Sequence, residues 1–510
     1  LGRRFKFPIM NLLLIILALS FLAHSLAESE KGQIISYFNR TSFPSDFLFG
    51  AGSSAYQVEG SPLQFGRGPS NWDQFTRLFP GKITDQSTGE VTCDFYHKYK
   101  DDIQLAKKIG LDTFRMSISW SRVIPSGRIR NGVNQIGVQF YNDVINELIS
   151  NGIQPFVTLY HFDTPQGLEE AYLGPLSSNI VSDFVDFADF CFKTYGDRVK
   201  RWTTINEANI FSRFGYGEGA LAPGRCSMGE GNCTAGDSAT EPYLVTHNLL
   251  LSHAAAANLY KTKYQGKQKG EIGMNFHAAW YYPLNDTSPA DSQAASRARD
   301  MDYRRVLYPL TFGDYPESMK NLVGKRLPAF TKEQSKMLVD SQDFISLNYY
   351  TAYYVYDAPS SNGNLSYNTD GRNVVTGFRN GVAIGEQTAA PLFFTYPKGL
   401  YRLLMYVKRV YKSPKIYITE NGYASSGSLT FSQSINDKKR VSSMNDHLKY
   451  ILKAITKGCN VKGYYAWALT DNWEWGSGFS VRFGLIHVDF ATLKRFFKSS
   501  ALWYKRFLLH

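Results

Sequence analysis

Short apolar runs rich in β-branched and aromatic residues alternate along this chain with longer stretches in which apolar residues recur at helical spacing. The short runs predict buried strands, and the longer stretches, with charges on their other side, predict amphipathic helices. The expected strands are Phe47–Ala51, Thr113–Ser119, Gln154–Tyr160, Arg201–Ile205, Glu271–Phe276, Phe344–Asn348, Ile416–Thr419 and Val461–Trp467. The expected helices include Tyr99–Ile109, Val138–Ser150, Ile180–Tyr195, Tyr243–Tyr264, Gly399–Val410 and Asp437–Lys457.

This alternation is typical of βαβ units, which assemble into a parallel sheet. Eight parallel strands with crossover helices close into a barrel, so the sequence predicts an α/β protein built as a single (β/α)8 TIM barrel. No long linker or low-complexity segment interrupts residues 28–510, which favours one domain there. In such a barrel the catalytic residues lie at the carboxyl ends of the strands.

The first 27 residues have the organisation of a secretory signal peptide rather than of a fold. Basic residues among the first six precede the apolar run Leu12–Ala23, and Ser25–Ala27 offers small residues for cleavage. If Met10 is the initiator, residues 1–9 lie upstream of the true start. We therefore expect the secretory route, ending outside the cell (the apoplast) or in the vacuole. No later apolar run reaches the ~20 residues of a membrane-spanning helix.

An oxidising compartment changes how the cysteines and sequons are interpreted. Cys226 and Cys233 lie in one Gly-, Ser- and Asn-rich loop and are expected to form a disulfide, the alternative being two free surface thiols. The remaining cysteines, Cys93, Cys191 and Cys459, are expected to be buried or isolated thiols. Candidate glycosylation sites follow the Asn-X-Ser/Thr pattern at Asn39, Asn232, Asn285 and Asn364.

Composition is that of an ordinary globular protein, with 43% hydrophobic and 20% charged residues. The formal net charge is +12, and removing residues 1–27, which hold two Arg and one Lys, leaves +9. A basic surface could hold the protein near acidic wall polymers or membranes, but a soluble protein of alkaline pI is the interpretation that the sequence favours. No run of five basic residues occurs, so nucleic acid is not an expected partner. No His/Asp/Glu cluster has metal-ligand spacing, so neither a metal nor another cofactor is expected.

Two of the expected strands lead directly into a glutamate. The fourth strand is followed by Asn206-Glu207, and the seventh by Glu420-Asn421. Glycoside hydrolysis requires two carboxyl groups at one site. One protonates the leaving oxygen, and the other, as a carboxylate, attacks the anomeric carbon. A single glutamate after a strand usually forms a salt bridge instead. For two glutamates at matching strand ends, this alternative interpretation is much weaker.

The chain contains the segment IYITENGY around Glu420 and the segment YYAWALTDNWEWGSGFSVRFGLIHVD closer to its carboxyl end. With these segments it resembles a known family, glycoside hydrolase family 1, and within it the plant β-glucosidase branch. The TENG and WALTDNWEW segments are the most specific part of that resemblance. The matching segments, in family order over residues 47–489, are FLFGAGSSAYQVEG, FRMSISWSRVIPSG, VTLYHFDTPQGLE, WTTINEAN, PLTFGDYP, NYYT, IYITENGY and YYAWALTDNWEWGSGFSVRFGLIHVD.

The resemblance implies a retaining β-glucosidase that acts on small O-β-glucosides, or close β-glycosides, through a covalent glycosyl-enzyme. Glu207 corresponds to the general acid/base and Glu420 to the nucleophile, with carboxyl groups roughly 5–5.5 Å apart. Tyr350 should orient the nucleophile, and Asn206 should bind the sugar 2-hydroxyl. The remaining sugar pocket is expected from Gln57, His161, Trp467, Glu474, Trp475 and Phe483.

Several positions depart from the family pattern. Ala208 replaces a proline after the acid, Phe162 replaces a tryptophan, and Ala279 stands where an asparagine is often found. Leu392 replaces a tryptophan of the aglycone platform. We therefore expect a reshaped aglycone slot, lined by aliphatic side chains with Phe393 and Phe394.

Two family activities are disfavoured by the residues that remain. Thioglucosidases carry Gln at the acid position, where this chain keeps Glu207. Phosphoglycosidases replace the Glu474-Trp475 pair, whose carboxylate would repel a phosphate. The alternatives left open are a transglucosidase that passes the sugar to an acceptor alcohol, and a catalytically inactive sugar-binding relative. Glucose versus galactose or fucose, the natural aglycone and the oligomeric state are not fixed by the sequence.

Overall fold

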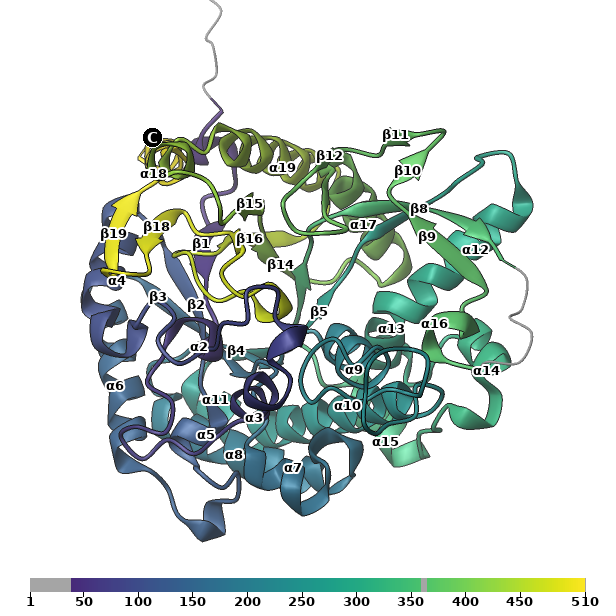
Figure 1. Cartoon of the computed structure of the whole chain (residues 1–510), viewed down its shortest axis with the longest axis horizontal. Coiled ribbons are helices and arrows are strands. Elements are labelled where there is room, and N and C mark those ends of the chain that lie inside the picture. Colours follow the sequence, from purple (N-terminus) through teal and green to yellow (C-terminus); the bar gives the residue numbers. More distant parts are fainter. Residues whose placement is uncertain (1–37, 359–364, 510) are drawn as a thin grey trace, which may run out of the picture.

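In the computed structural model, which describes residues 38–358 and 365–509, eight parallel strands close into a barrel ringed by helices (Figure 1). The expected signal peptide and the sequon at Asn364 lie outside the described residues. Around the barrel the strand order is β1-β16-β14-β7-β5-β4-β3-β2, so each barrel strand neighbours the next one along the chain. The predicted (β/α)8 fold is therefore confirmed.

All eight predicted strands are present, and their ends differ from the predicted ones by at most two residues. Strand β14 extends through Glu420, so the glutamate expected after this strand lies within it. The barrel strands are β1 (Leu48–Gly52), β2 (Thr113–Ser117), β3 (Gln154–Tyr160), β4 (Arg201–Ile205), β5 (Glu271–His277), β7 (Phe344–Asn348), β14 (Ile416–Asn421) and β16 (Val461–Trp467).

The six predicted helices are also present and pack around the barrel in chain order, shown by the colour sequence in Figure 1. The predicted helix Tyr243–Tyr264 is an α-helix that continues as a π-helical turn over Tyr260–Tyr264. These helices are α4 (Phe95–Ile109), α6 (Gln135–Ser150), α8 (Asn179–Tyr195), α10 (Glu241–Leu259), α17 (Pro397–Val410) and α19 (Lys438–Thr456).

The loops at the rim of the barrel contain additional helices and strands. Helix α9 (Ala208–Tyr216) follows β4 directly, and a small sheet of β6 (Trp280–Pro283), β8 (Ala352–Asp357) and β9 (Asn373–Thr376) extends from β5 and β7. Other helices in this part of the chain include α12 (Pro289–Arg299), α13 (Arg305–Phe312), α14 (Glu317–Val323), α15 (Lys332–Val339) and α16 (Tyr367–Asp370).

Aromatic side chains fill the interior of the barrel. Phe156 of β3 makes edge-to-face contacts with Phe344, Tyr417 and Tyr465, with ring centroids 5.5–5.6 Å apart. These rings come from strands that are not neighbours of β3, so they meet inside the barrel. Because this plug fills the interior, the barrel is a packed core, and any substrate must bind at its rim.

The cysteines behave as predicted. Cys226 and Cys233 form a disulfide, and Cys93, Cys191 and Cys459 are free and buried. Of the described sequons, Asn232 and Asn285 are exposed and Asn39 is half-buried. Within the described residues, no helix combines the length and apolarity that a membrane crossing requires.

Candidate active site

Glu207 and Glu420 line one pocket of about 470 Å³ at the carboxyl ends of the barrel strands. Glu207 follows β4 in the left-handed backbone conformation, with φ 41° and ψ 55°, and caps the start of α9. Glu420 lies near the end of β14. The two predicted carboxylates therefore converge on one cavity rather than pairing with separate surface cations.

Each oxygen of the Glu420 carboxylate accepts a hydrogen bond from a different side chain. A guanidinium nitrogen of Arg115 donates to Oε1, and the Tyr350 hydroxyl donates to Oε2 over 2.7 Å. The Arg115 side chain is fully buried and that of Glu420 is 6% exposed, so water does not compete for these bonds. A carboxylate fixed in this way cannot rotate away from the pocket.

The same arginine connects the two glutamates through asparagines. Its other terminal nitrogen donates to the Asn206 side-chain oxygen over 2.7 Å. The Asn348 amide donates to that oxygen over 3.3 Å and to Glu207 Oε1 over 2.6 Å. A continuous hydrogen-bond network therefore runs from Glu420 to Glu207 and fixes their relative position.

The two carboxyl groups differ in what surrounds them. Burial and, after it, the nearby negative charge of Glu420 raise the pKa of Glu207 to about 7. Glu420 is instead paired with a cation, Arg115. A carboxyl that keeps its proton near neutral pH suits a general acid, and an ion-paired carboxylate suits a nucleophile.

His277, at the end of β5, also lines this pocket. Its Nδ1 lies 3.9 Å from the Asp302 carboxylate, which also accepts hydrogen bonds from Asn209 and Tyr281. Although burial opposes the charged form, Asp302, Glu207 and Glu420 together raise the pKa of His277. Its positive charge in turn opposes the rise in the Glu207 pKa.

Trp467 and Glu474 form the deep wall of the pocket. The Trp467 indole donates to Glu474 Oε1 over 3.3 Å, and Gln57 donates to Glu474 Oε2 over 3.1 Å. Burial raises the pKa of Glu474 to about 8. Gln57 is fully buried behind Glu474, with its amide also bonded to Asn472 and its oxygen to Ser54. It thus positions Glu474 in this structure and does not itself line the cavity.

His161 joins this wall from the end of β3. Its ring lies nearly parallel to those of Trp467 and Trp475, at centroid distances of 6.0 and 5.9 Å. Burial and the charge of Arg115 hold its pKa well below the usual value, so the imidazole is neutral. Nε2 faces the Asn206 amide at 3.1 Å, while Nδ1 has no partner within the described structure. Phe483 packs edge-on against Tyr350 on the opposite side.

The outer part of the pocket is mainly apolar. Of the ten site residues that the sequence predicts, all except Gln57 line the cavity. The apolar residues that also line it include Phe162, Ile210, Phe214, Leu221, Ala390, Pro391, Phe393 and Val481. The expected aglycone lining is wrong for Phe394, and Leu392, at the position of the family's tryptophan, does not line the cavity. Phe394 is buried in a separate cluster with Ala352 and Ile384, and Leu392 is 63% exposed.

The sequence did not reveal several polar residues that contact the glutamates or share their pocket, among them Arg115, Asn348 and His277. These three all lie inside predicted apolar strands or at their ends. The available signal was a charged or amide side chain in an otherwise apolar strand, since such a group is buried only with a partner.

A buried carboxyl with a raised pKa and a second, ion-paired carboxylate in one aromatic pocket are the groups that a glycoside hydrolase needs. The chain belongs to glycosyl hydrolase family 1, whose family model matches residues 39–509. It is similar to furcatin hydrolase from Viburnum furcatum, with 53% identity, covering 91% of this chain and 86% of that protein. It is also 52% identical to β-glucosidase 17 from Arabidopsis thaliana, covering 92% and 91%.

Solved structures agree with this assignment. A mutant rice β-glucosidase in a covalent complex with Glc from GA4GE matches with a TM-score of 0.90 and 42% identity, covering 92% of this chain and 99% of that chain. A β-glucosidase from Humicola insolens in complex with glucose matches with a TM-score of 0.88 and 38% identity, covering 91% and 98%. The protein is a retaining β-glucosidase that acts on β-glycosides through a covalent glucosyl-enzyme, and nothing favours transglucosylation or an inactive relative.

Proposed function

We propose that Glu420 is the nucleophile and Glu207 the acid/base of this β-glucosidase, and that its leaving group is a bulky, apolar alcohol or phenol. The observation that carries the proposal is the asymmetry of the pair. Glu420 accepts hydrogen bonds from Arg115 and Tyr350, whereas burial and repulsion raise the pKa of Glu207 to about 7. The same site thus holds one carboxylate ready to attack and one carboxyl ready to protonate.

In the first step a Glu420 oxygen forms a bond to the anomeric carbon as the bond to the glycosidic oxygen breaks. The Glu207 proton passes to that oxygen, so the aglycone leaves as a neutral alcohol. In the second step Glu207, now a carboxylate, takes a proton from water as the water oxygen bonds to the anomeric carbon. The ester bond to Glu420 breaks, and two inversions leave the β configuration.

Arg115 and Tyr350 act as positioning residues in this scheme. Each donates to a different oxygen of Glu420, so the carboxylate is oriented before the sugar arrives. Asn206 accepts a hydrogen bond from Arg115 at its oxygen, and its amide nitrogen lies 3.1 Å from His161 Nε2, so one N–H of the amide remains for a sugar hydroxyl. Preorganisation of this kind lowers the barrier because little reorganisation remains for the transition state.

For the sugar itself, we assign the ring to the Trp467 side of the pocket and the hydroxyls to Glu474 and His161, with Gln57 positioning Glu474 from behind. A pyranose has an apolar face that an indole can cover and equatorial hydroxyls that polar groups can bind. The unpartnered Nδ1 of His161 suits such a hydroxyl, because a buried polar atom without a partner is costly.

The expected secretory location belongs to the same proposal. It is supported by the signal-peptide pattern of the first 27 residues and by the disulfide Cys226–Cys233, which is stable in an oxidising compartment. Expressing the full chain with a fluorescent tag at its C-terminus tests the route. Retention of the tag in the cytosol would contradict it.

The catalytic assignment is tested with a set of aryl β-glycosides that differ in sugar and in leaving group, with product stereochemistry followed by proton NMR. We expect β-glucose as the first product and faster turnover for large apolar aglycones than for methyl glucoside. Initial release of α-glucose, or equal rates for small and large aglycones, would contradict the respective part of the proposal.

A further inference from the structure

A second pocket, of about 560 Å³, lies outside the barrel between strand β6 and helix α17, and it shares no lining residue with the catalytic pocket. We call it the α17 pocket. No Asp or Glu lines it. Its aromatic walls are Trp280 and Tyr406, and its cations are Arg402, Lys408, Arg409 and Lys412.

Within the described residues, none of these four cations forms an ion pair with a carboxylate. The local sequence explains why, because the chain contains no acidic residue between Glu386 and Glu420. Glu386 itself pairs with Lys439. Like charges gathered around one cavity repel each other, so this arrangement lowers stability unless an anion binds there.

Helix capping accounts for only part of the charge. Lys408 and Arg409 lie in the last turn of α17, where cations interact favourably with the helix dipole, and Lys408 also donates to the Lys457 carbonyl over 2.6 Å. Arg402 lies two turns earlier, and Lys412 lies beyond the end of the helix. The dipole gives no reason for either of these.

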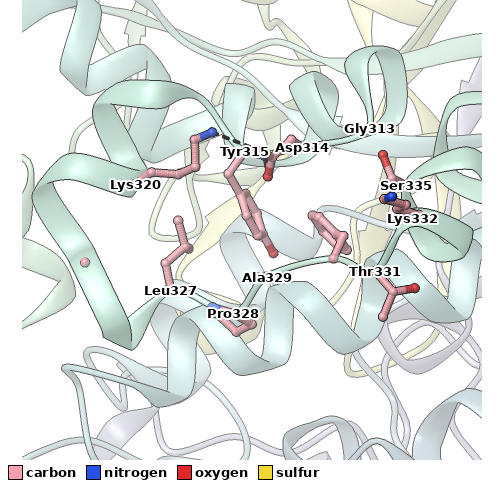
Figure 2. Close-up of a pocket in the computed structure, with 12 residues that line it drawn as sticks. Gly313, Asp314, Tyr315, Lys320, Leu327, Pro328, Ala329, Thr331, Lys332 and Ser335 are labelled. Carbon is pink, nitrogen blue, oxygen red and sulfur yellow. Dashed lines mark hydrogen bonds and ion pairs between the residues drawn. The ribbon is translucent and has the colours of Figure 1, made fainter.

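Another external pocket shows that such a charge distribution is not general in this protein. Figure 2 shows the cavity of about 400 Å³ between α13 and α15, in which Lys320 pairs with Asp314 over 3.0 Å. An acidic side chain belongs to that pocket and neutralises a cation at its edge. The α17 pocket has no such group, and in Figure 1 α17 lies well apart from α15.

We propose that the α17 pocket binds an acidic polysaccharide made of uronic acid units. The charged row from Arg402 to Arg409 spans seven residues of helix, or about 10 Å, which one small anion cannot bridge. A polymer that repeats its carboxylates along the row can contact successive cations, and guanidinium groups bind carboxylates in bidentate fashion. Arg299 lies over both aromatic rings, 5.4 Å from the Trp280 centroid and 5.7 Å from that of Tyr406, so a pyranose would stack on the ring surface that Arg299 leaves uncovered.

Two other polyanionic surfaces fit less well. Trp280, Met405 and Tyr406 are each only half-exposed, so no apolar side chain of this pocket protrudes to insert into a membrane. Four cations are also fewer than the ~6–10 phosphate contacts typical of duplex DNA binding. The uronate polymer is thus the occupant that the shape and the charge favour together.

The test measures binding of polygalacturonate to the purified full-length protein by calorimetry at low and at moderate salt. We expect binding that weakens as salt rises. The triple variant Arg402→Glu/Arg409→Glu/Lys412→Glu should weaken binding by at least about tenfold, since three charge-assisted contacts are replaced by repulsion. The matched control reverses three exposed cations, namely Lys332, which lines the pocket of Figure 2, and Lys325 and Lys336, which follow its lining residues Gly324 and Ser335 in the chain.

Both triple variants carry the same net charge, so they separate a specific site from general attraction. The control should bind like the wild type, and both variants should hydrolyse an aryl glucoside normally because no changed residue lines the catalytic pocket. Equal loss of binding in the control would overturn the assignment of the binding site to the α17 pocket.

A further variant, Tyr406→Leu, keeps every charge and removes one ring. It should weaken polygalacturonate binding several-fold and leave inorganic polyphosphate binding unchanged, because only the sugar can stack on that ring. Equal or tighter binding of polyphosphate, duplex DNA or anionic phosphatidylserine vesicles through the same cations would overturn the choice of a uronate polymer.

Discussion

Arg115 and Glu420 form an ion pair inside the barrel, with side chains 0% and 6% exposed. The pair does more than neutralise a carboxylate, because the second terminal nitrogen of Arg115 holds Asn206, the residue next to the proposed acid. One buried guanidinium therefore sets the positions of both ends of the catalytic network.

Replacing Arg115 with Lys should separate this bridging role from its charge. A lysine keeps the positive charge but has one ammonium group in place of a planar fork, so it cannot hold two partners in fixed directions. We expect kcat/KM for an aryl glucoside to fall by roughly 10²-fold, the size of effect that misplacement by about 1 Å produces. Arg122→Lys is the matched control, since Arg122 is equally buried and pairs with Glu59 away from the catalytic pocket. Equal loss in both folded variants would contradict the role of Arg115.

Removing the nucleophile should change the acid as well. In Glu420→Gln we expect turnover to be abolished, because no carboxylate remains to form the glucosyl ester. The same change removes a negative charge that raises the Glu207 pKa, so this pKa should fall below its wild-type value of about 7. Carbon-13 NMR of labelled glutamate side chains measures it. An unchanged Glu207 pKa would show that the two carboxyl groups do not interact.

The pH profile should report Glu207 directly. Its folded-state pKa is raised, so the proton needed by the leaving group is present below pH 7 and is lost as the pH rises through about 7. We expect kcat/KM to decline over that range. Glu207→Gln should remove this decline and slow substrates with poor leaving groups by roughly 10²–10⁴-fold, with a much smaller effect on activated aryl glucosides. A uniform loss across leaving groups would exclude Glu207 as the acid.

The strand pattern and the two glutamates could be predicted because each follows from local sequence. A barrel strand is a short apolar run, and the rule that active sites lie at carboxyl ends then selects Glu207 and Glu420. The supporting residues could not be found that way. Arg115 and Asn348 contact the glutamates across the barrel, and such contacts depend on closure and register, which no single segment encodes.

The outer wall shows a second limit. Phe393 and Phe394 were both expected to line the aglycone slot, but neighbouring residues of an extended chain point to opposite sides. Phe393 therefore stacks on Tyr350 in the pocket, while Phe394 packs behind it with Ala352. The residue types alone do not show which of the two phenylalanines points into the pocket.

The disulfide should stabilise the loop beside the aglycone slot. Cys226 and Cys233 enclose a short loop, for which chain-entropy arguments give about 2–3 kcal/mol. The double variant Cys226→Ser/Cys233→Ser should therefore unfold at a lower denaturant concentration. Reductant should lower the stability of the wild type and leave that of the variant unchanged. If reductant lowered the stability of the wild type and of the variant equally, the loss of stability would not come from this disulfide.

Phe393 offers the sharpest test of the aglycone slot, because its chain neighbour is a natural control. Its ring stacks on Tyr350 at 5.0 Å and lines the pocket, while Leu392 is 63% exposed. Phe393→Ala removes apolar surface that an aromatic leaving group would cover, a loss of about 1.5 kcal/mol or more.

We therefore expect KM for aryl glucosides to rise roughly tenfold in Phe393→Ala, since 1.4 kcal/mol corresponds to a factor of ten. KM for methyl glucoside should change little, because a methyl group does not reach this wall. Leu392→Ala should leave both values unchanged. An equal rise for methyl and aryl glucosides would place the effect on Tyr350 and the nucleophile that it orients, and not on the leaving group.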